Sequence, residues 1–476
     1  MIGCFPLAAI FAVLTTAPPP APDRPGSDVL AEWWVDASAS PGGSGMRERP
    51  FKSLGAALAR AGQSAARIHL AAGLYRGPFQ PAGGTELVGT GAAVLFADGP
   101  GAVVSAGGYL ALKNVIIQGG EVGIEAASEL RLSDVSFSGQ RSLGVHQRSG
   151  RLLASGAVFS AGVSEGTAVR IESNAQAELG RCTFQGPYRR ALQLNAPGRV
   201  AIAESTFDGP VTGIHQVGGS ARASRTRFAS GRGPAVFCAQ GSLELFDVDV
   251  YGHEYALQGG EGCTVRALRF SSVGAERAAI ALTRSTAQLE EVTAIDSGSF
   301  GAVQLVGSTV MLRRFRFQRP EAYGLAGRQS TLSISDGAIS DVTDKGGSAG
   351  DGIHLRGCRG SIESVSILRT AGAGLLAAEA SSMELRDFSV DRCHWGGVIA
   401  ETLAHVRGSS WTVRNCDAPA IAVPDAAQVE VDVVRSEGNS GGLFWVESAR
   451  GGKLRVWCAT EDGGTTSASR CADVAR

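Results

Sequence analysis

The chain has 476 residues, of which 65 are glycine, while 6% are aromatic and 19% are charged. Glycine at this level, without the period of collagen or a low-complexity run, indicates very many turns and is unusual for a compact enzyme. The formal net charge of −1 gives the whole chain no attraction for nucleic acid or for anionic lipid, so neither is expected as a partner.

The N-terminal residues contain an apolar run, FPLAAIFAVLTTA (5–17), that is too short to span a bilayer comfortably. We predict a signal peptide over 1–17 and a proline-rich linker over 18–31, although no Lys or Arg precedes the apolar run. The alternatives are a misplaced start codon and a short membrane-proximal anchor. An exported chain would be secreted, periplasmic or held in the cell envelope, and no later segment is expected to span a membrane.

From about residue 120 the chain repeats one short phrase: a small residue, an apolar residue, any residue and an apolar residue. The first apolar residue, here called the anchor, recurs about every 22 residues, as expected of a repeat array. One interval, from Leu325 to Ile353, is longer than the others. The anchors are Ile124, Val145, Val169, Leu192, Ile214, Val236, Leu257, Ile280, Val303, Leu325, Ile353, Leu375, Val398, Ile421 and Leu443.

The second half of each repeat alternates apolar and other residues, with one skip in the middle, as in LRLSDVSF (130–137). Alternation with period two predicts strands, and the skip predicts a bend between two short strands. Three short strands in a coil of about 22 residues are typical of a parallel β-helix. We therefore predict an all-β chain, a right-handed parallel β-helix of at least 15 coils over 85–457, with a C-terminal tail or cap over 458–476.

Two columns of inward residues follow from this repeat, and we expect both to be core. One contains Val135, Cys182, Ser205, Thr226, Val248, Val292, Phe315, Phe388 and Trp411. The other contains Phe137, Phe159, Phe184, Phe207, Phe228, Val250, Phe317 and Val390. An aromatic ladder of this regularity indicates core packing and not a ligand platform.

The nine cysteines are too few for a dense disulfide framework in a chain of this length. We expect Cys182, Cys238 and Cys263 to be small core residues. Cys393 and Cys416 occupy equivalent places in consecutive repeats, so their pairing is possible. The best disulfide candidate is Cys458 with Cys471.

Charged residues of alternating sign occupy the outward positions beside the inward columns. One column reads Arg181, Glu204, Arg225, Asp247, Glu291, Arg314 and Asp336, and its neighbour reads Arg227, Asp249, Arg269 and Arg316. Opposite charges on adjacent parallel strands, about 4.8 Å apart, stabilise the pairing and fix its register. We interpret these columns as structural ion pairs and not as catalytic carboxylates.

Over roughly residues 85–457 the repeats resemble those of the pectin-lyase-like β-helix superfamily. The segment 32–84 is similar to the opening motif of many bacterial members, which implies a strand at Trp33–Asp36, a turn at Pro50–Ser53 and a short capping helix over 54–61. Leu54, Ala57, Leu58 and Ala61 give that helix the apolar face that a cap requires. The superfamily contains lyases, hydrolases, epimerases and proteins without known activity, so its fold does not imply one function.

In enzymes of this superfamily, catalytic groups project from one sheet into a groove, and the longest interval of this chain is the natural place for such a groove. It carries SDVTDKGGSAGDGIHLRG (340–357). A carboxylate, a base and an aromatic platform are the groups that uronate chemistry or glycoside hydrolysis needs. The candidate catalytic residues are Asp351, His354, His394 and Lys345, and the candidate substrate-binding residues here are Glu321, Tyr323, Arg369 and Trp395.

A second candidate binding surface is the outward row of residues that directly follow the anchors. It contains Glu125, His146, Arg170, Gln193, His215, Phe237, Gln258, Gln304 and His354, of which His215 and Gln193 are candidate substrate-binding residues. Amide and imidazole groups suit hydroxyl and carboxylate recognition along an extended glycan. The alternative is a polar face that contacts only solvent.

The catalytic motifs of the superfamily are missing from this chain. The coils after Asp351 carry no acidic pair of the polygalacturonase kind, and the Arg-x-Pro-x-x-Arg of pectate lyases and the Asp-Pro-His of alginate epimerases are absent. We therefore expect an extracytoplasmic protein that binds or scaffolds polysaccharide without catalysis, with no metal and no cofactor. The alternative is a lyase, hydrolase or epimerase that acts on an acidic glycan near Asp351.

Overall fold

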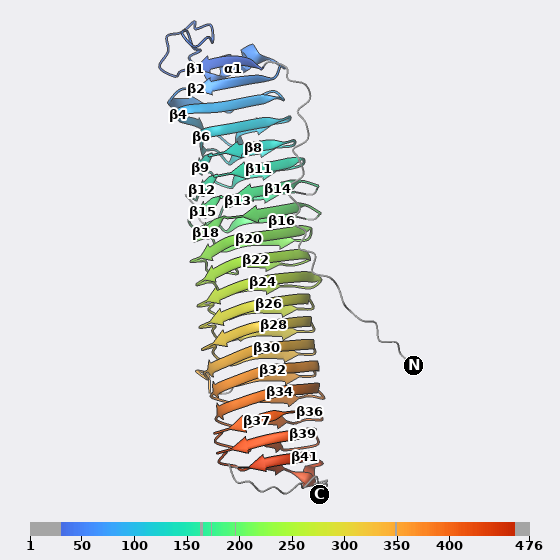
Figure 1. Ribbon diagram of the computed structural model, residues 1–476. Helices are drawn as coiled ribbons and strands as arrows, with labels where there is room; N and C mark the ends of the chain where they lie inside the picture. Colours follow the sequence, from blue (N-terminus) through green and yellow to red (C-terminus); the bar gives the residue numbers. More distant parts are fainter. Residues whose placement is uncertain (1–29, 162–164, 173, 196, 348–349, 462–476) are drawn as a thin grey trace, which may run out of the picture.

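The computed structural model describes residues 30–461, except 162–164, 173, 196, 348 and 349. Its strands follow one another down a single column from the N-terminal to the C-terminal end (Figure 1). The pairings between these strands are all parallel, as for β20 with β22 and β22 with β24. The chain is thus an all-β parallel solenoid of about 17 turns, and the fold predicted from the repeat is confirmed.

Two sheets run the length of the solenoid. The first sheet has 25 strands: β1 (Ala31–Val35), β2 (Ala66–Leu70), β3 (Gly73–Arg76), β4 (Thr85–Ala97), β6 (Leu110–Gly119), β8 (Leu130–Ser133), β9 (Ser136–Ser138), β11 (Arg151–Ser155), β12 (Val158–Ser160), β14 (Gln176–Gly180), β15 (Thr183–Gln185), β17 (Arg199–Ala203), β18 (Thr206–Asp208), β20 (Ser220–Ala229), β22 (Gly241–Tyr251), β24 (Cys263–Val273), β26 (Thr286–Ile295), β28 (Thr309–Gln318), β30 (Thr331–Val342), β32 (Arg359–Thr370), β34 (Ser382–Cys393), β36 (His405–Ser409), β37 (Trp411–Arg414), β39 (Gln428–Glu437) and β41 (Lys453–Glu461).

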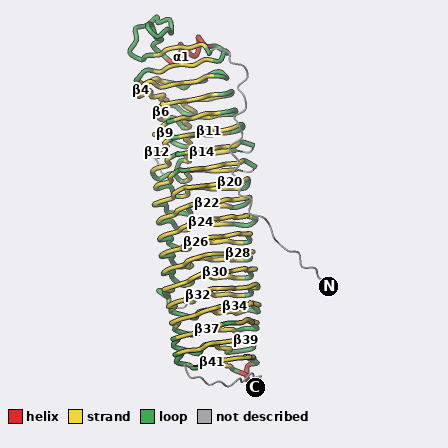
Figure 2. Tube along the Cα trace, in the orientation of Figure 1, coloured by secondary structure: helices red, strands yellow, loops and turns green. Residues whose placement is uncertain are grey.

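The second sheet has 16 strands: β5 (Ala102–Ala106), β7 (Val122–Ala126), β10 (Leu143–Gln147), β13 (Thr167–Ile171), β16 (Arg190–Asn195), β19 (Thr212–Val217), β21 (Val236–Cys238), β23 (Tyr255–Gly259), β25 (Ala278–Thr283), β27 (Gly301–Val306), β29 (Tyr323–Arg328), β31 (Asp351–Arg356), β33 (Leu375–Ala378), β35 (Val398–Ala400), β38 (Ile421–Val423) and β40 (Phe444–Val446). Turns and loops join the two sheets at their edges (Figure 2).

The long strands β20, β22, β24, β26 and β28 of the first sheet each bend at one residue whose backbone is left-handed, for example Arg225 in β20 with φ 47°. This is the skip seen in the sequence, and it divides the sheet into two faces. Eight successive bends alternate in charge without a break: Arg181, Glu204, Arg225, Asp247, Arg269, Glu291, Arg314 and Asp336. Direct ion pairs join several neighbours, such as Arg225 with Glu204 at 2.7 Å and Arg314 with Glu291 at 3.0 Å.

We predicted Arg269 in the outward column that contains Arg227, Asp249 and Arg316, and this prediction was wrong. Arg269 has the left-handed φ of 54° that marks a bend residue, and its Nη2 donates to Asp247 Oδ2 at 3.1 Å. The pairing of Phe270 with Val248, and of Leu268 with Phe246, fixes this register. Leu268 therefore points outward, and the buried Ser272 takes the inward position that an apolar residue holds in most coils.

The interior is a stack of inward columns, as predicted. Rings of Phe137, Phe159, Phe184, Phe207 and Phe228 lie in sequence with centroids 4.5–4.9 Å apart, and each is fully buried. Stacked rings of this kind add packing energy to the burial of apolar surface. Residue size also varies within a column, as where Gly337 is the Cα partner of Phe315 in the preceding coil.

The N-terminal end carries the helix α1 (Leu54–Ala61), at the bounds expected from the sequence (Figure 2). Ser53 is its N-cap, with Oγ accepting the Ala56 N–H at 3.3 Å, and Leu54, Ala57 and Ala61 are buried. The short helix η1 (Ser448–Arg450) precedes β41 at the other end. No helix among the described residues is long and apolar enough to cross a membrane.

Two disulfides join consecutive coils. Cys393 pairs with Cys416, as the repeat allowed. Cys238 pairs with Cys263, so the expectation that these two are merely small core residues was wrong, although both are buried. Cys182 is a buried free thiol, as expected. The proposed partner of Cys458, Cys471, lies outside the described residues.

Candidate functional site

The outward row that follows the anchors is a continuous line along the second sheet. Consecutive members are Cα partners on adjacent strands: Glu125, His146, Arg170, Gln193, His215, Phe237, Gln258, Ala281, Gln304, Ala326, His354, Leu376, Ile399, Ala422 and Trp445. The first five are polar or charged, whereas the last four are apolar. The polar end of the row is therefore where a hydroxylated or charged ligand would find partners.

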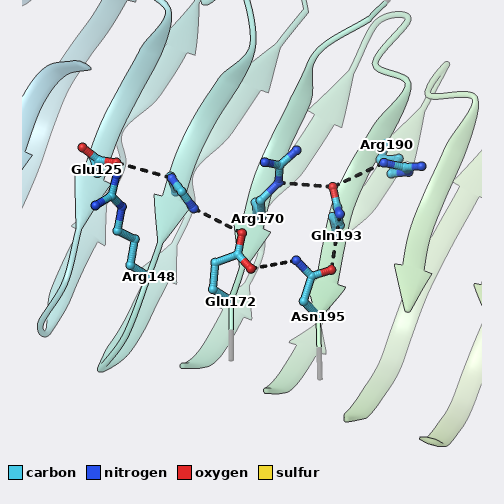
Figure 3. A network of polar contacts seen from close by, with 8 residues as sticks. Glu125, Arg148, Arg170, Glu172, Arg190, Gln193 and Asn195 are labelled. Atoms are coloured by element: carbon cyan, nitrogen blue, oxygen red, sulfur yellow. Dashed lines mark hydrogen bonds and ion pairs between the residues drawn. The ribbon is translucent and has the colours of Figure 1, made fainter. Parts of the chain in front are cut away.

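Side chains of this row and of the positions two residues further on form one hydrogen-bonded network (Figure 3). The imidazole of His146 lies between two carboxylates, with Nδ1 3.5 Å from Glu125 and Nε2 3.3 Å from Glu172. Glu172 also accepts from the Asn195 amide at 2.8 Å. We call Glu125, His146, Arg148, Arg170, Glu172, Arg190, Gln193 and Asn195 the polar face.

Hydrogen bonds keep Glu172 ionised. Partial burial alone would raise the pKa of this carboxyl, but the hydrogen bonds from Asn195 and His146 and the charge of Arg170 together lower it. Glu125 is held in turn by an ion pair with Arg148. The first half of the polar face is thus internally neutralised, since each of its carboxylates has a cationic or amide partner.

The second half of the polar face has an excess of positive charge. Arg170 Nε and Arg190 Nη1 both donate to one oxygen, Gln193 Oε1, at 3.2 and 3.4 Å (Figure 3). Burial, followed by the nearby charges of Arg189 and Arg170, lowers the pKa of Arg190. Among the described residues, no carboxylate forms an ion pair with any of these three arginines. We call Arg170, Arg189 and Arg190 the arginine cluster.

His215 continues the row in the next coil. Its ring stacks on that of Phe237, with centroids 5.0 Å apart. Burial, with a further contribution from the positive charge of Arg190, lowers the pKa of His215 to about 4. The imidazole is therefore neutral near pH 7, so it can exchange hydrogen bonds with a ligand without adding charge.

Two of the predicted catalytic residues meet in β31. Asp351 is 2% exposed, and its Oδ2 lies 2.7 Å from His354 Nδ1. Its other oxygen accepts the Ala373 N–H at 2.7 Å. The ring of Tyr323 lies edge-on to His354, with centroids 5.0 Å apart. A buried carboxylate that orients an imidazole is a recurrent arrangement in acid–base catalysis.

The remaining nitrogen of His354 is already used. Arg356 Nε donates to His354 Nε2 at 2.9 Å, and Arg356 also pairs with Glu379 at 2.9 Å. His354 is therefore a neutral imidazole that donates to Asp351 and accepts from Arg356. It could act as a base only if the Arg356 side chain moved away.

The other predicted residues of this region do not join Asp351 and His354. Lys345 pairs with Glu321 across the longest turn. Arg369 is a bend residue that pairs with Asp341 at 2.5 Å. The remaining two lie on the turn before β35, where His394 Nδ1 contacts Asp417 at 3.0 Å and Trp395 is 43% exposed.

Sequence reasoning missed Arg148, Glu172, Asn195, Arg189 and Arg190, which complete the polar face and the arginine cluster. The sequence did contain a signal for three of them. Arg148, Glu172 and Asn195 each stand two residues after a member of the predicted row, so on a strand their side chains point to the same side as that row. No group of three or more His, Cys, Asp or Glu residues that could hold a metal ion occurs among the described residues.

No protein-family model matches the chain, and no curated protein matches it. Solved structures do. Pectate lyase Pel9A shares 14% identity over 54% of this chain and 78% of its own, with a TM-score of 0.45. The PL6 family alginate lyase AlyGC shares 10% identity over 90% of this chain and 100% of its own, with a TM-score of 0.31. The GH136 lacto-N-biosidase from Eubacterium ramulus shares 11% identity over 91% of this chain and 68% of its own, with a TM-score of 0.27. At such identities these likenesses concern the course of the backbone and not the chemistry of a site.

Proposed function

We propose that this protein binds an extended acidic polysaccharide along the polar face of its second sheet, without catalysis. The observation that carries the proposal is the arginine cluster, which brings three guanidinium groups together, none of them in an ion pair with a carboxylate of the described residues. A glycan carboxylate or sulfate would supply the missing counter-charge, and guanidinium groups bind such anions in a bidentate manner.

The geometry of the row suits a linear polymer. Hydrogen-bonding side chains recur on each successive strand from β7 to β19, about 4.8 Å apart. The neutral His215 and its stacked neighbour Phe237 add a ring surface beside the cluster. The ligand would therefore lie along the solenoid axis, with its anionic group at Arg170 and Arg190 and its hydroxyls along the amides.

Export of the protein fits the cysteine chemistry. Two disulfides join neighbouring coils, and such bonds persist in oxidising compartments. A polysaccharide ligand would then be met outside the cell or in its envelope, which is where we place the protein in this proposal.

The test is affinity electrophoresis of the full chain through gels that contain acidic or neutral polysaccharides. We expect retardation by an acidic polysaccharide, and its loss when Arg170→Gln and Arg190→Gln are combined. Arg148→Gln is the matched control, because Arg148 lies on the same face but is already neutralised by Glu125. Equal retardation of the double variant and the wild type, or none for any acidic polymer, would contradict the proposal.

One observation favours an enzyme as the second candidate function, namely the contact between the buried Asp351 and His354. In that case His354 would be the base of a lyase, hydrolase or epimerase, and Asp351 would orient it. Turnover of an acidic polysaccharide, read as unsaturated products or new reducing ends, should then vanish in Asp351→Asn but persist in Asp341→Asn. The absence of any turnover by the wild type would exclude this candidate for the glycans tested.

A further inference from the structure

An elongated hollow lies on the first sheet, away from the polar face. It has a volume of about 730 Å³ and crosses five consecutive strands, β8, β11, β14, β17 and β20, which follow one another down the solenoid (Figure 1). We call it the trough. Its lining consists of Arg131, Leu132, Ser133, Leu153, Ala154, Ser155, Glu178, Leu179, Gly180, Ala201, Ile202, Ala203, Arg222 and Ser224.

The trough exists because one outward row is small in five consecutive coils. This row reads Ser133, Ser155, Gly180, Ala203 and Ser224, and its members are Cα partners on adjacent strands. Large side chains close both ends, since Lys113 precedes Ser133 in the row and Phe246 follows Ser224. With coils about 4.8 Å apart, the small row extends over about 19 Å along the solenoid axis.

The rim of the trough carries charges that are already compensated. Arg131 Nε lies 2.6 Å from Glu129, and the guanidinium of Arg222 lies 4.8 Å above the ring of Phe246 and 4.0 Å from Glu244. Glu178 is likewise paired, with Arg151. The charged residues that line the trough are therefore each paired, unlike those of the arginine cluster.

What the trough does offer is a mixture of hydroxyl groups and apolar surface. Ser133 and Ser155 place hydroxyls on the floor, and Ser155 Oγ accepts from Arg181 Nη2 at 2.8 Å. Leu153 and Ala201 supply apolar contacts in the adjacent row. The backbone of the floor is already paired within the sheet, so a peptide strand would find no main-chain partners there. A polymer with many hydroxyls and apolar ring faces is a better match than a peptide.

We propose that the trough binds one extended strand of a neutral polysaccharide, parallel to the solenoid axis. The compensated rim matches an uncharged ligand, and the small row admits a chain about as long as the five coils. The apolar faces of the sugar rings would contact Leu153 and Ala201, and the hydroxyls would contact the serines and the rim arginines. This site is independent of the acidic ligand that we propose for the polar face.

The test uses the full chain and a series of neutral β-linked oligosaccharides of increasing length, titrated calorimetrically. Ala203→Trp should fill the trough and weaken binding at least tenfold, because its side chain points outward and leaves the core intact. Ser335→Trp is the matched control, since Ser335 stands in the same outward row beyond the trough. Affinity should increase with chain length up to the length of the small row and should change little with salt.

Two results would overturn this inference: equal affinities for Ala203→Trp and Ser335→Trp, or no binding of any neutral oligosaccharide by the wild type. Binding of a proline-rich peptide to the wild type that is lost in Ala203→Trp would also overturn it. Failure here is distinguishable from failure at the polar face, because that face is tested with acidic ligands and with Arg170→Gln and Arg190→Gln.

Discussion

Arg170 and Arg190, from adjacent strands of the second sheet, donate to the same oxygen, Gln193 Oε1. One neutral amide oxygen thus holds two guanidinium groups together where a carboxylate would be the ordinary partner. Like charges held this close repel each other, and an anionic ligand would relieve that repulsion. The proposal of an acidic ligand rests on this local arrangement and not on the fold as a whole.

The pKa of His215 can be measured directly. The pKa lies at about 4 in the fold, below the ordinary histidine value of 6.5, because of burial and the charge of Arg190. The unfolded chain binds the proton more readily between these values, so this residue should reduce stability as pH falls from 6.5 toward 4. Histidine NMR should show His215 titrating near the lower value, and Arg190→Gln should raise its midpoint. Titration of His215 near 6.5 in the wild type would contradict the assigned environment.

The alternating column of bend residues should respond to charge reversal. Arg225→Glu would place three acidic residues in consecutive bends, with Glu204 on one side and Asp247 on the other. Loss of the attraction and gain of repulsion should destabilise the fold by about 1 kcal/mol, and less at high salt. Arg232→Glu, outside the column, is the control. Equal melting temperatures for the two variants in low salt would show that the alternation has no energetic role.

Close packing within one inward column gives a packing prediction, because Gly337 is the Cα partner of Phe315. A Cβ on Gly337 would come within 2.0 Å of the Phe315 ring. Gly337→Ala should therefore destabilise the solenoid by about 1–3 kcal/mol through overpacking. Gly55→Ala in α1 is the control, because a Cβ there meets no atom within 4 Å. Thermal unfolding followed by circular dichroism should separate the variants, and a Gly337→Ala protein as stable as Gly55→Ala would refute this account of the core.

The two disulfides predict a pattern of cysteine reactivity. Without reductant, Cys238, Cys263, Cys393 and Cys416 should resist alkylation even in denaturant, whereas the buried thiol of Cys182 should react only after unfolding. Mass spectrometry of the labelled peptides would measure the alkylation of the four paired cysteines and of Cys182. Replacing Cys393 and Cys416 together by Ser should cost about 2–4 kcal/mol of stability. Alkylation of Cys393 in the oxidised native protein would contradict the pairing.

The fold could be predicted from sequence because its information is periodic and local. The anchors and the inward aromatic column each follow from a pattern that recurs from one coil to the next. The bounds of α1 were predicted instead from the resemblance of residues 32–84 to an opening motif and from the apolar face of that segment. The error at Arg269 shows the limit of that reasoning. Leu268 is apolar but points outward, and Ser272 is polar but buried, so a hydrophobic pattern read in that coil alone is shifted.

The candidate site was harder to predict, because it depends on contacts between coils. The row containing Gln193 and His215 could be written down in advance, but nothing in the sequence shows that Arg170 and Arg190 share one acceptor. The same limit applies near Asp351, where the sequence grouped eight residues, most of which the structure divides between different partners. The Cys238–Cys263 bond was missed because the two cysteines occupy different positions of the repeat.

The most direct test of the central claim is the salt dependence of acidic-polysaccharide binding. We predict that the dissociation constant of a uronate oligosaccharide rises steeply with salt for the wild type and for Arg148→Gln, because the arginine cluster carries the interaction. The combined Arg170→Gln and Arg190→Gln variant should bind weakly at all salt concentrations. A steep salt dependence that persists in this variant, or a wild type that does not bind acidic oligosaccharides at low salt, would contradict the account.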